Sequence, residues 1–370
     1  MDGGFLLWFL QDCEDGEPRE EEVERREVQQ PVIRPLDARP RLRTRVYRTR
    51  VDLEQMSDNK VITDYHLNRM AIYELYEEIR ADIDPPTARS HAVPGLEKLL
   101  TVLQFLATGT FQHVIGGNSG VDQSTVSRHL TQVLQALKKR VRQYIKFPEE
   151  EGEQQGIKQD FFQIAGMPHV LGAIDCTDVL FTPPSDEEMM YRNRKLGFSL
   201  NIQAVCDANL RILDVVSKFP GSCLDSYILA NSALGQKFAD GKFGYGWLLG
   251  DAGYGCKPWL MTPLAAPRTE PERRYNESHM LTRCTIERTF RVLKSRFRCL
   301  HLTVGSLQYA PHKVADIVTV CCMLHNIALK HQLEINVSMP PELDKYPSPI
   351  ESDVAEGNAV RQKLIEQSFT

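Results

Sequence analysis

The chain has 370 residues, and its 42% hydrophobic and 25% charged content is typical of a globular protein of one or two domains with a sizeable core. The net charge of −5 is unevenly distributed, because residues 1–30 contain ten acidic and three basic residues whereas the remainder contains 39 acidic and 41 basic residues. The nine scattered cysteines include no Cys-x-x-Cys pair, which argues against a disulfide framework or a structural zinc site and favours a reducing compartment.

The first 60 residues are predicted to form a disordered tail without a packed core. The apolar run Phe5–Leu10 is too short for a signal peptide or a membrane span, and we expect no membrane-spanning segment later in the chain. Residues 11–30 are rich in Glu, and residues 31–50 then contain seven arginines interrupted by prolines, which disfavours a helix. Three roles fit the arginine-rich part. It is a linker whose charge pairs with the acidic tail, or a nuclear-import signal, or an arm that binds phosphates.

Residues 61–150 have helical periodicity and are expected to form a small all-α domain. Helices are predicted over 63–83, 94–109 and 110–117, the last closed by Gly116 and Gly117. Asp122 or Ser124 can cap a fourth helix with one apolar stripe, so that the last two helices resemble a helix-turn-helix.

The fourth helix of this region is predicted to expose polar groups that suit base edges and phosphates. Its start would expose Thr125, Arg128, His129 and Gln132, and its end has a group of basic residues. The candidate DNA-binding residues are therefore Arg128, Lys138, Lys139 and Arg140. A packing bundle with a polar face is the alternative interpretation.

Residues 151–333 change to a β-rich pattern after a polar segment at 149–156, where we place the domain boundary. Strands are predicted over 169–182, 199–206, 211–219 and 247–250, with a hairpin turn at 207–209 and a helix over 224–234. A Pro-rich insertion is expected up to residue 279, followed by helices over 282–300 and 311–331. Residues 334–370 are expected to form an irregular tail with a short final helix.

Two aspartates stand where a sheet could present them to a metal ion. Asp175 interrupts an apolar strand, where an unpaired carboxylate would be costly, and Asp251 follows directly after another apolar strand. Asp178 lies three residues beyond Asp175 and therefore on the opposite face of the strand, so we exclude it from the same site. Hydrolysis of a phosphodiester needs convergent carboxylates that bind two hard divalent cations.

Glu287 is the one acidic residue in a row of cations along the predicted helix 282–300. Next to the buried face of that helix lie Arg283, Glu287, Arg291, Lys294 and Arg298. Glu287 is either a third metal ligand between phosphate-binding cations or half of an ordinary Glu–Arg pair on a helix surface. We predict catalytic and metal-binding roles for Asp175, Asp251 and Glu287, and DNA contacts for the four cations.

Eight short motifs resemble the PIF/Harbinger DDE transposase superfamily, and the whole chain is most similar to nucleases derived from Harbinger transposases. The motifs are Ala-Ile-Asp-Cys-Thr (173–177), Tyr-Arg-Asn-Arg-Lys (191–195), Pro-Gly-Ser-x-x-Asp-Ser (220–226), Gly-Asp-Ala-Gly-Tyr (250–254), Trp-Leu-Met-Thr-Pro (259–263), Ile-Glu-Arg-Thr-Phe (286–290), Leu-Lys-Ser-Arg-Phe (293–297) and Leu-His-Asn-Ile (324–327). A weaker match, Gly-Val-Asp-Gln-Ser-Thr-Val-Ser-Arg (120–128), falls on the predicted helix-turn-helix. Asp178, Leu224 and Arg291 depart from the residues usual in the family.

The resemblance implies an α/β fold: a ribonuclease H-like DDE nuclease domain preceded by the small helix-turn-helix-like domain. It places the family's acidic triad on Asp175, Asp251 and Glu287 and implies Mg²⁺ or Mn²⁺ as cofactor. It further implies hydrolysis of DNA by a two-metal mechanism without autonomous transposition, a nuclear location with some cytoplasmic protein, and a Myb-like DNA-binding partner. A homo-oligomer is possible within the family. The alternative is a non-enzymatic nuclear DNA-binding or scaffold protein that retains the fold.

Overall fold

A five-stranded mixed sheet forms around the long strand β1 (Val170–Leu180) in the computed structural model, which describes residues 51–87, 92–194, 197–334 and 353–370. The strand order is β3-β2-β1-β4-β5. Strands β1, β2 (Ser199–Cys206) and β3 (Ile212–Pro220) are antiparallel, whereas β4 (Trp247–Leu249) and β5 (Leu260–Met261) continue the sheet in parallel with β1. This mixed α/β arrangement agrees with the α/β fold class predicted from the sequence.

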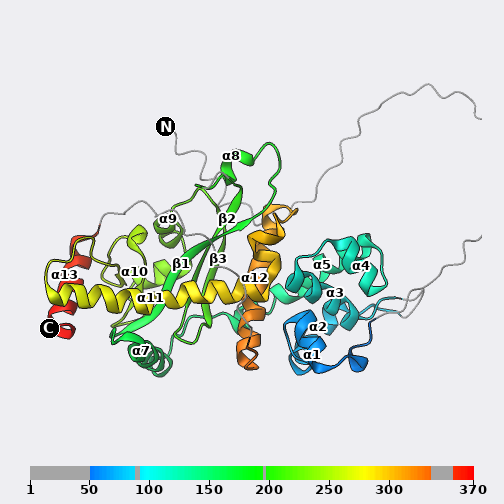
Figure 1. The fold of residues 1–370 in the computed structure, drawn as a ribbon, viewed down its shortest axis with the longest axis horizontal. Coiled ribbons are helices and arrows are strands. Elements are labelled where there is room, and N and C mark those ends of the chain that lie inside the picture. Colours follow the sequence, from blue (N-terminus) through cyan, green and yellow to red (C-terminus); the bar gives the residue numbers. More distant parts are fainter. Residues whose placement is uncertain (1–50, 88–91, 195–196, 335–352) are drawn as a thin grey trace, which may run out of the picture. The chain divides into compact units, whose positions relative to one another are not determined.

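Helices cover both faces of the sheet (Figure 1). Helices α7 (Glu151–Ala165), α11 (Glu270–Arg296) and α12 (Pro311–Lys330) share an apolar core with one face. Helices α9 (Asp225–Ala230) and α10 (Ala233–Ala239) enclose a second core on the other face. Contrary to the sequence-based expectation, α12 is long and apolar enough to cross a membrane, but 67% of its most apolar window is buried inside the protein, as in a core helix.

Helix α11 is much longer than the sequence pattern predicts. It begins at Glu270, where Thr269 and Glu272 form a reciprocal capping box and Pro271 occupies the first turn. The predicted Pro-rich insertion up to residue 279 is therefore wrong from Glu270 onward, and it also contains β5. The apolar stripe at 286–300 marks only the second half of the helix, whose first turns are polar. The helix ends at Arg296, four residues before the predicted end.

Within the part of the chain that the structure describes, six α-helices precede α7. They are α1 (Asp58–Tyr65), α2 (Arg69–Ile83), α3 (Gly95–Thr108), α4 (Gln112–Ser119), α5 (Gln123–Lys138) and α6 (Val141–Tyr144). The single helix predicted over 63–83 is divided, because His66 adopts a left-handed conformation with φ 54°. Helix α4 continues past Gly116 and ends at Ser119, because Gly120 adopts a left-handed conformation with φ 69°.

Several other segments differ from their predicted structure. Residues 53–65 contain a 3₁₀ turn (Leu53–Gln55) and α1, so the predicted tail is wrong for its last residues, while residues 1–50 lie outside the described part. The polar segment proposed as a domain boundary forms the start of α7. The single helix predicted at 224–234 is two helices, because Ser232 caps α10.

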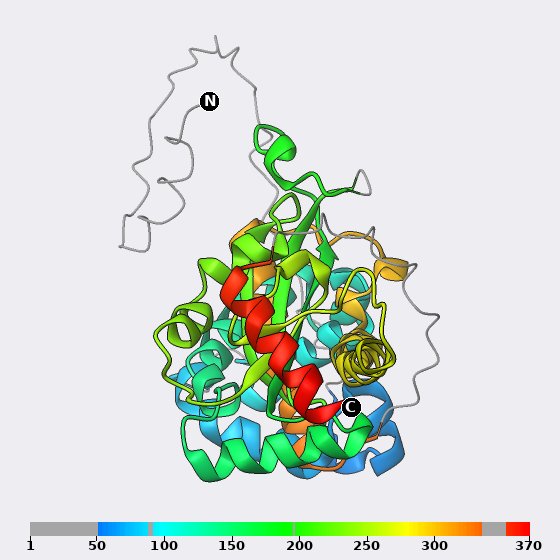
Figure 2. The same cartoon turned by 90° about the vertical axis from the view of Figure 1, so that its left-hand side faces the viewer.

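The end of the chain packs against the sheet edge. Helix α13 (Ala355–Ser368) lies beside the sheet in Figure 2, and it contacts β5 and α11. The buried Arg361 guanidinium donates to the Thr262 carbonyl and hydroxyl oxygens and forms an ion pair of 2.6 Å with Asp353. The expected irregular tail therefore ends in a helix of 14 residues that is part of the packed structure. A short α8 (Glu188–Tyr191) and 3₁₀ turns at Ala252–Tyr254, Arg298–Leu300 and Leu302–Val304 complete the described elements.

Candidate metal centre

Asp175 lies in the middle of β1, where the edge of this strand becomes free. Strand β4 pairs with β1 only as far as Ala173, so β1 extends beyond the end of its parallel neighbour. The Asp175 side chain is 4% exposed, and its Oδ1 accepts a hydrogen bond of 2.7 Å from the Cys176 backbone N–H. A carboxylate buried in this way needs cationic or hydrogen-bonding partners.

Asp251 reaches the same point because it follows β4 after a single residue. It caps the 3₁₀ turn Ala252–Tyr254, and its Oδ1 accepts a hydrogen bond of 3.0 Å from the Gly253 backbone N–H. This bond uses one oxygen and holds the carboxylate in position at the carboxyl end of a parallel strand, which is the usual ligand-binding edge of such a sheet. The structure therefore brings Asp175 and Asp251 together, as the sequence predicts.

Asp225 is the third member of the site, and sequence reasoning missed it. It is the first residue of α9 and is 5% exposed. Asn201 Nδ2 donates a hydrogen bond of 2.8 Å to its Oδ1, and Gln203 Nε2 donates one of 3.1 Å to its backbone carbonyl. The signal was present in the motif Pro-Gly-Ser-x-x-Asp-Ser, but an aspartate beside a Pro-Gly turn has the ordinary explanation of a turn or cap residue.

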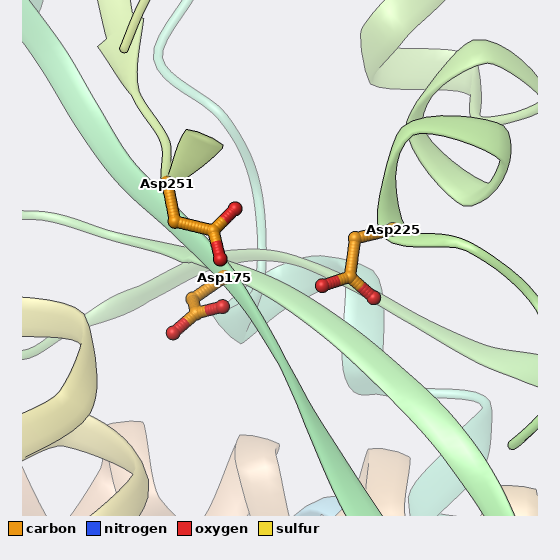
Figure 3. Close-up of side chains that lie close together, drawn as sticks. All are labelled: Asp175, Asp225 and Asp251. Atoms are coloured by element: carbon orange, nitrogen blue, oxygen red, sulfur yellow. The ribbon is translucent and has the colours of Figure 1, made fainter. Parts of the chain in front are cut away.

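The three aspartates form a cluster that we call the carboxylate cluster: Asp175, Asp225 and Asp251. One oxygen from each lies within 4.8 Å of the others, and Figure 3 shows the carboxylates pointing toward one another from separate elements. Two unit charges at this distance repel by roughly 3 kcal/mol at an effective dielectric of 20. Converging oxygen donors of like charge fit a hard divalent cation, which would offset this repulsion.

One wall of the cluster is a hydrogen-bonded group of uncharged side chains. Gln203 Nε2 donates to the Tyr254 hydroxyl at 3.1 Å, and the hydroxyl lies 3.3 Å from Cys176 Sγ. Burial raises the pKa of Tyr254 well above its usual value, and the nearby Cys176, Asp225 and Asp175 add to the increase. Tyr254 therefore stays protonated and positions Gln203 without adding charge.

Glu287 lies outside the carboxylate cluster but is connected to it. Its side chain is 45% exposed, and its Oε1 forms an ion pair of 2.6 Å with Arg283 Nη2. Arg283 Nη1 in turn lies 3.5 Å from Asp175 Oδ2, and the arginine side chain is only 18% exposed. Glu287 thus has the helical Glu–Arg pair that the sequence predicts, and its partner Arg283 also contacts the metal-ligand candidate Asp175.

The predicted row of cations divides into buried and exposed members, and its last member, Arg298, lies beyond the end of α11. Lys294 is buried and donates a hydrogen bond of 2.9 Å to the Asp178 carbonyl oxygen, whereas Arg291 and Arg298 are exposed. Asp178 accepts a hydrogen bond of 2.6 Å from the Ser199 hydroxyl and is not a member of the carboxylate cluster, in agreement with its predicted exclusion.

The candidate DNA-binding residues on α5 and directly after it, which we call the α5 cations, form hydrogen bonds or ion pairs within the protein. Lys138 forms an ion pair of 2.6 Å with Asp316, and Lys139 forms one of 2.5 Å with Asp82. Arg140 donates to the Glu78 carbonyl at 2.8 Å, and Arg128 bonds to Ser124 and Thr125 within its own helix. The predicted exposure of His129 is wrong, because this side chain belongs to the apolar stripe and is 5% exposed.

Comparison with known proteins supports the interpretation of the sheet. The protein family described as "DDE superfamily endonuclease" matches residues 174–326, which include all three members of the carboxylate cluster and Glu287. "Putative nuclease HARBI1" of Homo sapiens is 38% identical over 328 residues, covering 87% of this chain and 93% of the human protein. The protein of the same name from Xenopus laevis gives the same identity and coverage over 327 residues.

A more distant relative is the "Protein ALP1-like" of Arabidopsis thaliana. It is 29% identical over 251 residues, covering 63% of this chain and 60% of the plant protein. No solved structure gives a significant match.

Proposed function

This chain belongs to the family of Harbinger transposase-derived proteins, and from this membership we propose that it is a metal-dependent DNA endonuclease. The observation that supports the proposal most strongly is the convergence of Asp175, Asp225 and Asp251 within 4.8 Å on the matched domain. We further propose that the domain is ribonuclease H-like, since Asp175 lies on the first strand, β1, and Asp251 follows the end of the parallel strand β4.

The residues around the cluster suit a divalent cation, Mg²⁺ or Mn²⁺. Asp175, Asp225 and Asp251 would hold it, with Glu287 as a further ligand for a second ion. The chemistry that such ions supply is stabilisation of negative charge on the attacking and leaving oxygens of a phosphodiester. Asn201 orients the Asp225 carboxylate and the Gly253 N–H orients that of Asp251, which reduces the reorganisation needed for binding.

The DNA would approach along exposed cations. Arg291 on α11 and Arg298 just after it are exposed, and both lie within the matched endonuclease domain. We also propose that α4 and α5, which are joined by a tight turn at Gly120–Asp122, act as a helix-turn-helix-like DNA contact in a nuclear protein. Lys138 and Lys139 would then exchange their carboxylate partners for phosphates.

Nicking of supercoiled plasmid in the presence of Mg²⁺ or Mn²⁺ tests the proposal. The wild-type protein should nick, and Asp251→Asn should reduce the rate by at least about 100-fold, because a direct ligand matters more than the outer partners whose loss costs about 10–100-fold. Asp214→Asn is the matched control, since Asp214 lies on β3 outside the cluster. DNA binding by the wild type without nicking would overturn the enzymatic proposal and favour a non-enzymatic DNA-binding protein.

A further inference from the structure

Arg283 connects the two carboxylates that a second metal ion would need. Its Nη1 lies 3.5 Å from Asp175 Oδ2, and its Nη2 lies 2.6 Å from Glu287 Oε1. One planar guanidinium therefore bridges an acid on β1 and an acid on α11. A divalent cation that binds the same two side chains is attracted by the same negative charges and competes for the same oxygens.

The surroundings of Arg283 show that the bridge is part of the packed structure. The side chain is 18% exposed, so it is not a freely moving surface cation. Burial lowers the pKa of Arg283, but Asp175, Glu287 and Asp251 raise it, and the net result is a pKa above its usual value. The guanidinium is consequently a permanent positive charge held by the acids of the site.

We propose that Arg283 is an internal cation that takes the place of a second metal ion, so that Asp175 and Glu287 bind that ion only after the guanidinium leaves. The proposal rests on the proposed metal-dependent function and adds an order of events to it. The bridge contacts the carboxylate cluster at Asp175 Oδ2, and the first ion would be held where Asp175, Asp225 and Asp251 converge within 4.8 Å. The second ion is excluded until the bridge opens.

The bridge also gives Arg283 a use in the complex with DNA. A guanidinium that leaves two carboxylates needs another anion, and a phosphate of bound DNA is a bidentate partner of the same kind. Substrate binding would thereby favour loading of the second ion. The protein would keep its full metal complement for the time when a phosphodiester is in the site.

The number of Mn²⁺ ions bound without DNA tests the proposal, measured by calorimetry and by the electron paramagnetic resonance signal of free Mn²⁺. At Mn²⁺ concentrations where Arg283→Gln binds two ions, wild type should bind one. The second ion should bind at least about tenfold more tightly to the variant than to wild type. The matched control is Arg288→Gln, an exposed arginine of the same helix outside the predicted row of cations, which should behave as wild type.

The variant should also melt at a lower temperature than wild type without metal, and the difference should shrink with Mn²⁺, because the ion replaces the lost cation. If Arg283→Gln does not fold, Arg283→Lys provides the same test, since a single ammonium cannot bridge two carboxylates as a forked guanidinium does. One tight ion in both wild type and the Arg283 variants would overturn the inference and leave the metal centre intact. No ion in either protein would instead overturn the proposed function.

Discussion

The carboxylate cluster and the cations of α5 are both candidate sites, but their charges are arranged in opposite ways. In the cluster, three like charges from β1, α9 and the end of β4 converge to within 4.8 Å. At the end of α5, Lys138 faces Asp316 of α12 and Lys139 faces Asp82 of α2, so their charges are already balanced. Convergence of like charges is costly without a ligand, whereas balanced pairs are sufficiently explained by folding. The cluster is therefore the stronger indication of function.

The largest effect is expected from a change at Asp225, the member of the carboxylate cluster that sequence reasoning missed. Asp225→Asn keeps the shape of the side chain but removes one of three converging charges, so Mn²⁺ affinity should fall by at least about 100-fold. The metal-free variant should be as stable as wild type or more so, because repulsion within the cluster decreases. Calorimetric titration and thermal melting of the variant, with Asp214→Asn beside it, provide both readouts. Unchanged Mn²⁺ binding would exclude Asp225 from the site.

A smaller effect is expected from the residue that orients Asp225. Asn201→Leu has nearly the same volume but cannot donate the 2.8 Å hydrogen bond to Oδ1. Mn²⁺ affinity should fall by about 10–100-fold, the range typical of partners behind a metal ligand. The control is Asn231→Leu. Asn231 lies at the other end of α9, where its side chain donates a hydrogen bond to the Tyr227 carbonyl oxygen. Equal titration curves for the two variants would show that Asn201 only fills space.

The sequence was sufficient for the elements that obey local patterns. Strand β2 was predicted with its observed ends, and α12 and the Asp207 hairpin turn nearly so, because β alternation, helix periodicity and turn residues are local signals. The exclusion of Asp178 from a site that contains Asp175 also follows from strand geometry. Such predictions need no knowledge of what packs against the element.

The remainder depended on contacts between distant segments. Asp225 could not be chosen as a ligand because nothing near it in the sequence shows that α9 meets the open edge of β1. Likewise, Lys138 has its partner Asp316 on α12, far along the chain, so its spacing on α5 predicted the side chain's face but not its neutralisation. Arg283 was assigned to a phosphate for the same reason, although it lies against Asp175.

The smallest effect is expected from the α5 cations, because DNA must displace their internal partners. Alanine at Arg128, Lys138, Lys139 and Arg140 should weaken DNA binding, and each lost phosphate contact should reduce the slope of log affinity against log salt by about 0.9. The matched control removes four exposed cations elsewhere, Arg268, Arg273, Arg274 and Lys363. If both variants bind DNA with the affinity and salt dependence of wild type, the α5 residues serve packing alone.

The most direct measurement of the central claim is the anomalous scattering of Mn²⁺ in a soaked crystal of this protein. We expect a peak within about 2 Å of carboxylate oxygens of Asp175, Asp225 and Asp251, the distance typical of hard cations with oxygen ligands. The same crystal of Asp225→Asn should lose most of that peak. Absence of a peak at the cluster in a wild-type protein that still nicks DNA with Mn²⁺ would contradict the account, because the reaction would then use another metal site.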